Sequence, residues 1–248
     1  MSGLIFIVSF LVMSMINKYI LEQKNLRLSI FTSLVICTLF FKFGIGLEFF
    51  KFTFLALVLT IVGWIDFKTQ DVYTSDIIIG AVGGIFFIGL NIFLKGGFNI
   101  INIISFLVFV VGIVVIGILD VKCGDERIIY GSLICIYLLY FFVKGDLSFI
   151  NIFSACVIPS LAIGAMSLMG LMGWGDVEVI FICGLFLNFR LALLNLFIGI
   201  VLAGIHAIYL IFFKRKKGAI ALVPYLSLGA GITVLFGEEI INWYINLL

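Results

Sequence analysis

Three aspartates recur along the chain at nearly equal intervals. Asp66, Asp120 and Asp176 are separated by 54 and 56 residues. Two carboxyl groups held close together share one proton, because like charges at short range cannot both ionise cheaply. The ionised member of such a pair can take a proton from an attacking water while the protonated member polarises a carbonyl. If the fold brings two of these residues together, they are candidates for acid–base chemistry of this kind, which requires no metal and no other cofactor.

The sequence around the aspartates also repeats. Residues 66–71 and 120–125 share the pattern Asp-x-Lys-x-x-Asp, which indicates an internal duplication. The third aspartate closes the segment Gly173-Trp174-Gly175-Asp176, whose glycines permit a tight bend of the backbone. An interval of 54 to 56 residues fits one helical hairpin across a membrane and back. We therefore expect all three aspartates at the same membrane face.

The composition indicates the elements that must position these residues. Hydrophobic residues make up 64% of the chain and charged residues 11%, whereas soluble domains have roughly 45–50% and 25%. The net charge of +2 argues against the clustered basic surface that binds nucleic acid, so no nucleic-acid partner is expected. One histidine and five scattered cysteines favour neither a metal site nor a disulfide framework. The lipid bilayer is the expected environment.

The apolar segments predict an all-α, polytopic integral membrane bundle of about nine or ten transmembrane helices, with an internal helical-hairpin repeat. We expect a single domain over residues 1–248, with N-terminal helices in 1–50, aspartate-bearing hairpins in 51–188 and C-terminal helices in 189–248. The apolar segments lie near 3–17, 29–46, 52–65, 77–94, 99–119, 128–143, 147–171, 177–188, 191–213 and 219–236.

Charged residues concentrate in alternate loops and so predict the orientation. The loops around 18–28, 66–76, 120–127, 172–178 and 214–218 hold ten of the fifteen basic residues. Cytoplasmic loops carry such an excess, which places these loops in the cytoplasm and the N-terminus outside. Eight of the thirteen acids lie in three of these loops, 66–76, 120–127 and 172–178: Asp66, Asp71, Asp76, Asp120, Asp125, Glu126, Asp176 and Glu178. We therefore expect a multi-pass protein of the cell membrane whose active site faces the cytoplasm.

Several of these segments resemble the type IV prepilin peptidases, a family of intramembrane aspartyl proteases of the Gly-x-Gly-Asp type. Residues 65–73 resemble the first aspartate motif of that family and 173–176 resemble its second. Residues 184–187 and 219–230 are similar to its late signature, and the resemblance covers most of 29–248.

The resemblance implies an aspartic endopeptidase that removes the short basic leader of a prepilin or pseudopilin. It implies Asp176 as one catalytic carboxylate, with Gly173, Gly175 and Gln70 as supporting motif residues. The acids most suited to attract a basic leader are Asp71, Asp76, Asp125, Glu126 and Glu178.

The chain departs from the family in three respects. The family usually has proline where Tyr73 and Tyr130 stand, and commonly lysine where Glu178 stands. The region between the first two helices is short and lacks cysteine, so the family's Cys-x-x-Cys domain, associated with N-methylation, is not expected. Family members also place two crossings between their paired aspartates, whereas Asp66 and Asp176 are separated by four predicted crossings.

Three pairings of the catalytic aspartates therefore stay open: Asp66 with Asp176, Asp120 with Asp176, and Asp66 with Asp125.

Two other functional classes are compatible with the composition. An ion- or proton-coupled transporter would place acids near the middle of its helices, but here the helix interiors are nearly free of charge. A catalytically inactive component of a pilus or secretion machine is the other alternative. His206 lies inside an apolar segment and is expected to be a packed or hydrogen-bonded side chain.

Overall fold

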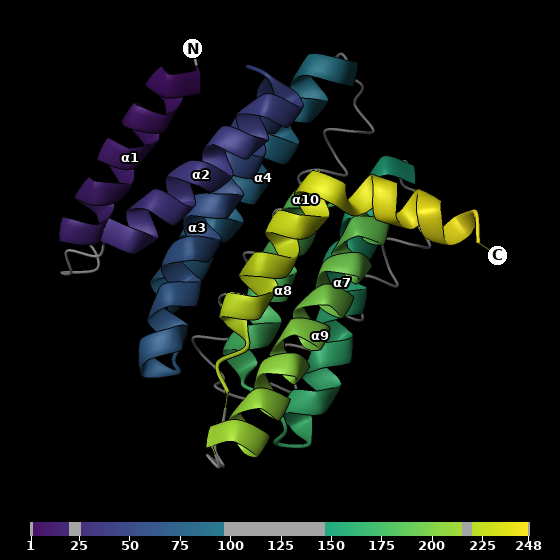
Figure 1. Ribbon diagram of the computed structural model, residues 1–248. Helices are drawn as coiled ribbons and strands as arrows, with labels where there is room; N and C mark the ends of the chain where they lie inside the picture. The colour runs from purple at the N-terminus through teal and green to yellow at the C-terminus, as the bar shows by residue number, and fades with distance from the viewer. Residues whose placement is uncertain (1, 20–25, 97–146, 215–219, 248) are drawn as a thin grey trace. The chain divides into compact units, whose positions relative to one another are not determined.

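The structure, a computed structural model, describes residues 2–19, 26–96, 147–214 and 220–247 (Figure 1). These residues form eight α-helices and no strand, which confirms the predicted all-α class. The predicted segments 99–119 and 128–143 lie outside the described residues, as do Asp120, Asp125 and Glu126. The helices are α1 (Ser2–Tyr19), α2 (Leu26–Phe43), α3 (Leu47–Thr69), α4 (Thr74–Gly96), α7 (Leu147–Leu168), α8 (Trp174–Phe186), α9 (Phe189–Lys214) and α10 (Val223–Ile245).

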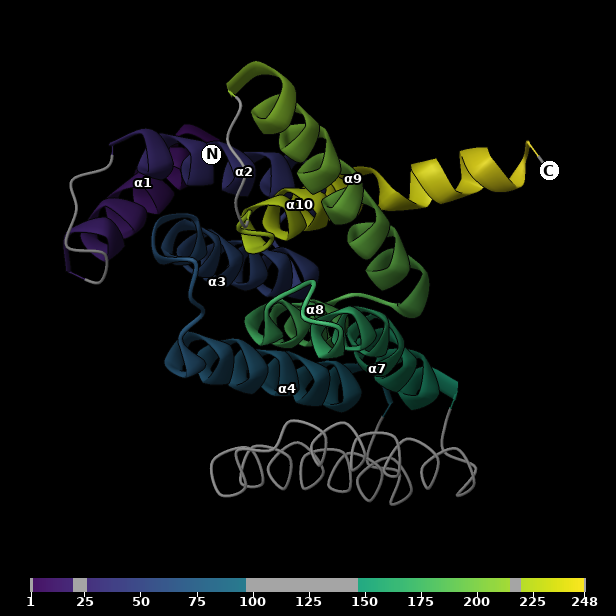
Figure 2. The ribbon, with the colours of Figure 1, turned by 90° about the horizontal axis from the view of Figure 1, so that it is seen from below.

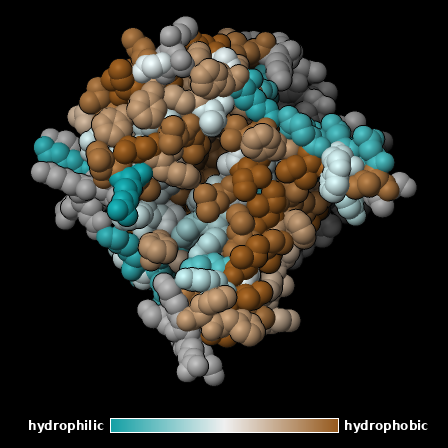
Figure 3. Space-filling model, in the orientation of Figure 1, coloured by the Kyte–Doolittle hydropathy of each residue, from teal (hydrophilic) through white to brown (hydrophobic). Residues whose placement is uncertain are grey.

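Five of these helices contain stretches long and apolar enough to cross a membrane, as expected of a multi-pass membrane protein. Large apolar side chains point outward from them: Phe41, Phe212 and Phe213 are 73%, 76% and 78% exposed. Figure 3 shows such side chains, in brown, over much of the face that it presents. Exposed apolar surface of this extent suits contact with lipid rather than with water. The five stretches are Leu26–Phe43, Leu47–Thr69, Thr74–Asn91, Asn151–Leu168 and Phe189–Phe213.

Several helix boundaries differ from the predicted ones because single charges do not end these helices. Helix α3 is 23 residues long and includes Lys51, whereas the predicted segment begins at residue 52. Lys51 is half-buried, its ammonium lies 5.0 Å from the centre of the Phe52 ring, and the helix continues through it. Helix α10 likewise continues through Glu238 and Glu239, beyond the predicted end at residue 236.

The chain divides into two compact units, residues 1–80 with 194–248 and residues 81–193. In the first unit, α2 packs against α1 and α3, and α10 packs against α3 (Figures 1 and 2). Fully buried side chains of α3 and α10 form the centre of this packing, among them Leu55, Val62 and Leu226. The prediction of one domain stays a prediction.

Residues in the left-handed conformation end two helices of the first unit. Gly44 follows α2 with φ +63°, and its N–H donates to the Phe40 carbonyl at 2.9 Å. Gln70 follows α3 with φ 57°, and its N–H donates to the Asp66 carbonyl at 2.8 Å. These bonds satisfy carbonyls that the helix ends leave open and turn the chain into the next helix.

In the second unit, α7 and α8 pack side by side (Figure 2). Their closest approach lies at Gly184 of α8, where an added Cβ would be 2.4 Å from the Ala155 carbonyl oxygen and 2.5 Å from the Cys156 Cα. Small residues allow such backbone contact between membrane helices. On another side of α8, the rings of Phe87 and Phe186 lie 6.2 Å apart. The part of α8 that follows Asp176 is thus tightly packed.

Candidate active site

Asp66 is buried in the last turn of α3, with 5% of its surface exposed. Its Oδ2 accepts a hydrogen bond of 3.1 Å from the backbone N–H of Val223, the first residue of α10. The two residues are 157 positions apart in the sequence. The bond therefore joins the segment that resembles the first aspartate motif to the segment that resembles the late signature.

The sequence at the start of α10 explains why a carboxylate fits there. The first N–H groups of a helix lack partners within the helix, and they carry a partial positive charge. Leu222, at the N-cap, has no polar side chain, and Pro224 has no N–H to satisfy. Asp66 supplies the missing acceptor from a neighbouring helix. A buried carboxylate and an uncapped helix start thus satisfy each other.

A serine and a glycine bring α3 and α10 together just before the aspartate. The Ser227 hydroxyl lies 2.9 Å from the Leu59 carbonyl oxygen and 2.8 Å from the Val223 carbonyl oxygen. A Cβ added at Gly63 would lie 3.0 Å from the Ser227 Oγ and 3.4 Å from the Pro224 Cα. Because residue 63 has no side chain, the first turn of α10 can reach Asp66.

The first turn of α10 is also bound to α9. The Tyr225 hydroxyl forms a short hydrogen bond with Nδ1 of His206, and the two ring centres are 5.5 Å apart. The His206 ring also stacks on Tyr209 at 6.3 Å. The structure thus confirms the expectation that His206 is a packed, hydrogen-bonded side chain. Through Tyr225 it helps to hold the backbone that binds Asp66.

The predicted accessory residues of this region follow Asp66. Gln70 is exposed and ends α3 in the left-handed conformation. Asp71 is exposed, and its N–H donates to the Thr69 hydroxyl at 3.3 Å. Asp76 is half-buried in the first turn of α4, and its Oδ2 has no hydrogen-bond partner among the described residues. An exposed carboxylate at position 71 suits contact with a basic peptide.

In the second unit, the Gly-x-Gly-Asp segment forms the N-terminus of α8. Gly173 is the N-cap, and its backbone N–H donates to Oδ2 of Asp176 at 3.2 Å. The preceding turn uses Gly170 at φ +71°, and the Ser167 hydroxyl donates to the Gly173 carbonyl at 3.2 Å. Asp176 is half-buried. The helix begins at Trp174, before the apolar segment near 177–188, because the motif itself forms the first turn.

The remaining predicted residues of this region are placed near Asp176. Gly175 lies between Trp174 and Asp176 in the first turn of α8, and Glu178 is half-buried two residues further on. Because Asp66 and Asp176 belong to different units, their pairing stays a prediction. The two pairings that involve Asp120 or Asp125 rest on residues outside the described ranges. No group of three His, Cys, Asp or Glu side chains in the described residues is arranged to hold a metal ion.

Sequence reasoning did not single out the contact of Asp66 with Val223. Pro224 is a signal for the helix start alone: proline favours the first turn of a helix, which would have moved the predicted start of the last helix from residue 219 to 223. Searches against protein-family models, curated proteins and solved structures find no match to this chain.

Proposed function

We propose that this protein is a membrane aspartyl endopeptidase that removes the leader peptide of a prepilin or pseudopilin at the cytoplasmic face of the cell membrane. The observation that carries the proposal is the bond between Asp66 and Val223. Two segments that resemble motifs of one peptidase family, distant in sequence, meet at a buried carboxylate.

The surroundings of Asp66 suit a residue that exchanges a proton. The backbone N–H of Val223 and the positive end of α10 favour the ionised carboxylate, whereas burial favours the neutral acid. Opposing influences of this kind let a small change in surroundings alter the protonation state. Together with a second aspartate, such a group can activate water, and the acid and base roles then belong to the pair rather than to either residue.

Asp176 is the preferred second carboxylate. Like Asp66, it accepts a backbone N–H at a helix N-terminus, and it lies in the segment that resembles the second family motif. Asp120 is the alternative partner for Asp176. The exposed carboxylate of Asp71, five residues from Asp66, is suited to attract the basic leader of the substrate.

The test is co-expression with a cognate prepilin, with leader removal followed by gel shift. We expect Asp176→Asn to abolish processing and one of Asp66→Asn or Asp120→Asn to abolish it as well. Asp71→Asn is the matched control: it removes an exposed carboxylate near Asp66 and should retain turnover, with a raised KM if Asp71 contacts the leader. Full processing by the Asp176 variant, with all variants present in the membrane at equal amounts, would overturn the mechanism.

A further inference from the structure

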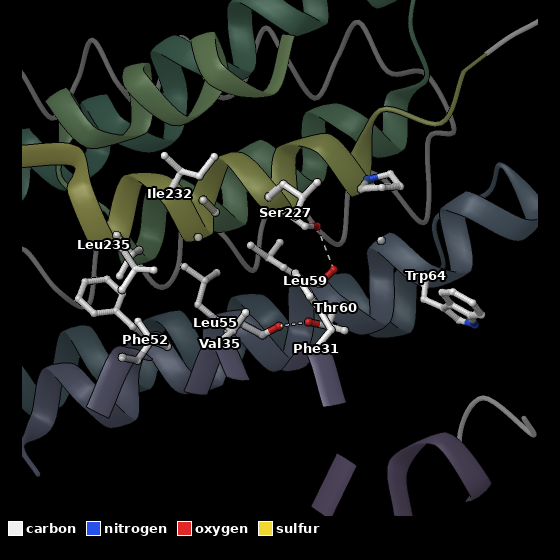
Figure 4. Close-up of a pocket in the computed structure, with 18 of the residues that line it drawn as sticks. Phe31, Val35, Phe52, Leu55, Leu59, Thr60, Trp64, Ser227, Ile232 and Leu235 are labelled. Carbon is white, nitrogen blue, oxygen red and sulfur yellow. Dashed lines mark hydrogen bonds between the residues drawn. The ribbon is translucent and has the colours of Figure 1, made fainter. Parts of the chain in front are cut away.

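A cavity of about 460 Å³ lies within the first unit, between α2, α3 and α10 (Figure 4). Its wall is almost entirely apolar, and the two hydroxyls that it contains are used within the helices. Thr60 donates to the Ala56 carbonyl at 2.7 Å, and Ser227 donates to the Leu59 carbonyl at 2.9 Å. Such a wall suits a hydrocarbon chain. Its apolar lining includes Phe31, Val35, Leu55, Trp64, Ile232 and Leu235.

One end of the cavity is basic. Leu28 at the start of α2 and Phe67 near the end of α3 both line it, and the residues next to them, towards the ends of their helices, are Arg27 and Lys68. The Lys68 ammonium lies 5.0 Å from the centre of the Trp64 ring, which itself lines the cavity. Tryptophan and basic side chains at helix ends are typical of the level of lipid headgroups.

Two acids lie near the same end of α3 and are held by other contacts. Asp66 binds the backbone of α10 through Oδ2, and Asp71 lies beyond the end of α3, with its backbone bound to Thr69. Arg27 is exposed at the first turn of α2. Arg27 and Lys68 thus adjoin residues that line this end of the cavity, and Lys68 also lies over the Trp64 ring.

We propose that this cavity binds an anionic phospholipid, with an acyl chain between α2, α3 and α10 and the phosphate at Arg27 and Lys68. Charge complementarity decides for this occupant: an apolar protein segment would use the cavity wall but not the basic end, whereas an anionic lipid uses both. Basic pockets between membrane helices bind anionic headgroups, with a gain per cation that amounts to roughly fivefold in affinity.

The experiment titrates the purified full-length protein in detergent with dioleoyl phosphatidylglycerol or dioleoyl phosphatidylcholine and counts bound lipids by native mass spectrometry. We expect one site that prefers phosphatidylglycerol by on the order of tenfold or more. Replacing Arg27 and Lys68 together by glutamine should bring the affinity for phosphatidylglycerol down to that for phosphatidylcholine. Lys51→Gln, on the part of α3 far from this end, is the charge control and should leave the preference intact.

Two glycines offer a matched test of the cavity itself. Gly231 lines the cavity, and a Cβ added there meets nothing within 4 Å. Gly231→Leu should therefore extend its side chain into the cavity and lower phosphatidylglycerol binding at least tenfold. Gly204 of α9 is equally open but does not line the cavity, so Gly204→Leu should bind lipid as the natural chain does.

Three results would overturn the proposal. Equal binding of the two lipids by the natural chain would remove the role of the basic end. Unchanged phosphatidylglycerol binding by Gly231→Leu, with Gly204→Leu folded equally well, would exclude the cavity as the acyl site. Conversion of a dimer to a monomer by Gly231→Leu without any change in bound lipid would identify a second copy of the chain as the occupant. None of these readouts depends on peptidase activity, so they are independent of the proposed function.

Discussion

Replacing Gly184 by alanine tests whether α8 is held by direct backbone contact with α7. The added Cβ would lie 2.4 Å from the Ala155 carbonyl oxygen and 2.6 Å from its carbonyl carbon. Carbon atoms pack best at about 3.5–4.0 Å, so the two helices must separate by on the order of 1 Å. Because the contacting atoms belong to the backbone, no rotation of a neighbouring side chain can relieve the overlap.

The expected cost follows from these contacts. Overpacking in a core costs about 1–3 kcal/mol, and a rigid backbone contact belongs at the upper end of that range. Alanine also gains about 1 kcal/mol over glycine inside a helix, and Gly204→Ala shows this gain alone, since its added Cβ meets nothing within 4 Å. The free energies of unfolding of the two variants should therefore differ by about 3 kcal/mol.

A third glycine-to-alanine variant should have an intermediate stability. At Gly199 of α9 the nearest atom to an added Cβ is the Cδ2 of Leu226 at 2.6 Å, the end of a flexible side chain. Gly199→Ala should therefore fall between the other two variants. The assay is reversible unfolding in mixed micelles with increasing dodecyl sulfate, followed by far-ultraviolet circular dichroism. Equal stability of the Gly184 and Gly204 variants would refute the close contact of α7 and α8.

Substitutions at three further positions test the contacts around Asp66. Asp66→Ala leaves the buried N–H of Val223 without an acceptor and should cost about 1–3 kcal/mol in the same unfolding assay, whereas Asp66→Asn retains an acceptor oxygen and should cost less. Tyr225→Phe removes the bond to His206 and should cost about 1 kcal/mol, and an unchanged stability would mean that the bond does not hold α10. Ser227→Ala should cost about 0.6 kcal/mol, the average for hydrogen bonds between membrane helices, and a stabilised variant would contradict the contact with Leu59.

Much of the fold was predictable because lipid imposes a simple rule. A segment that crosses a bilayer must be apolar over its length and satisfy its backbone bonds internally, so apolar stretches between polar loops predict helices directly. The boundaries were less predictable. Lys51 and Glu238 lie within helices because a single charge near a helix end can reach the surface while the backbone continues. Breaks in hydropathy therefore mark helix ends only to within a few residues.

The candidate site was predictable in its residues but not in its contacts. The spacing of the aspartates and the Gly-x-Gly-Asp segment pointed to Asp66 and Asp176, and the structure places both beside backbone N–H donors. The donor to Asp176 is three residues away and belongs to a local pattern. The donor to Asp66 comes from a helix 157 residues further along the chain, and no local pattern specifies which helix start will meet which carboxylate.

The hydrogen bond to a distant helix gives Asp66 a role in the fold. A buried carboxylate that caps a neighbouring helix is useful to the fold even if it does no chemistry, so its burial alone cannot separate a structural role from a catalytic one. The two roles need different properties of the side chain. A cap needs an acceptor oxygen, which asparagine also has, whereas an aspartyl peptidase needs a group that gains and loses a proton, which asparagine cannot do. A protein with Asp66→Asn that keeps its stability and loses all processing would therefore assign chemistry to Asp66, and one that keeps both would leave it only the cap.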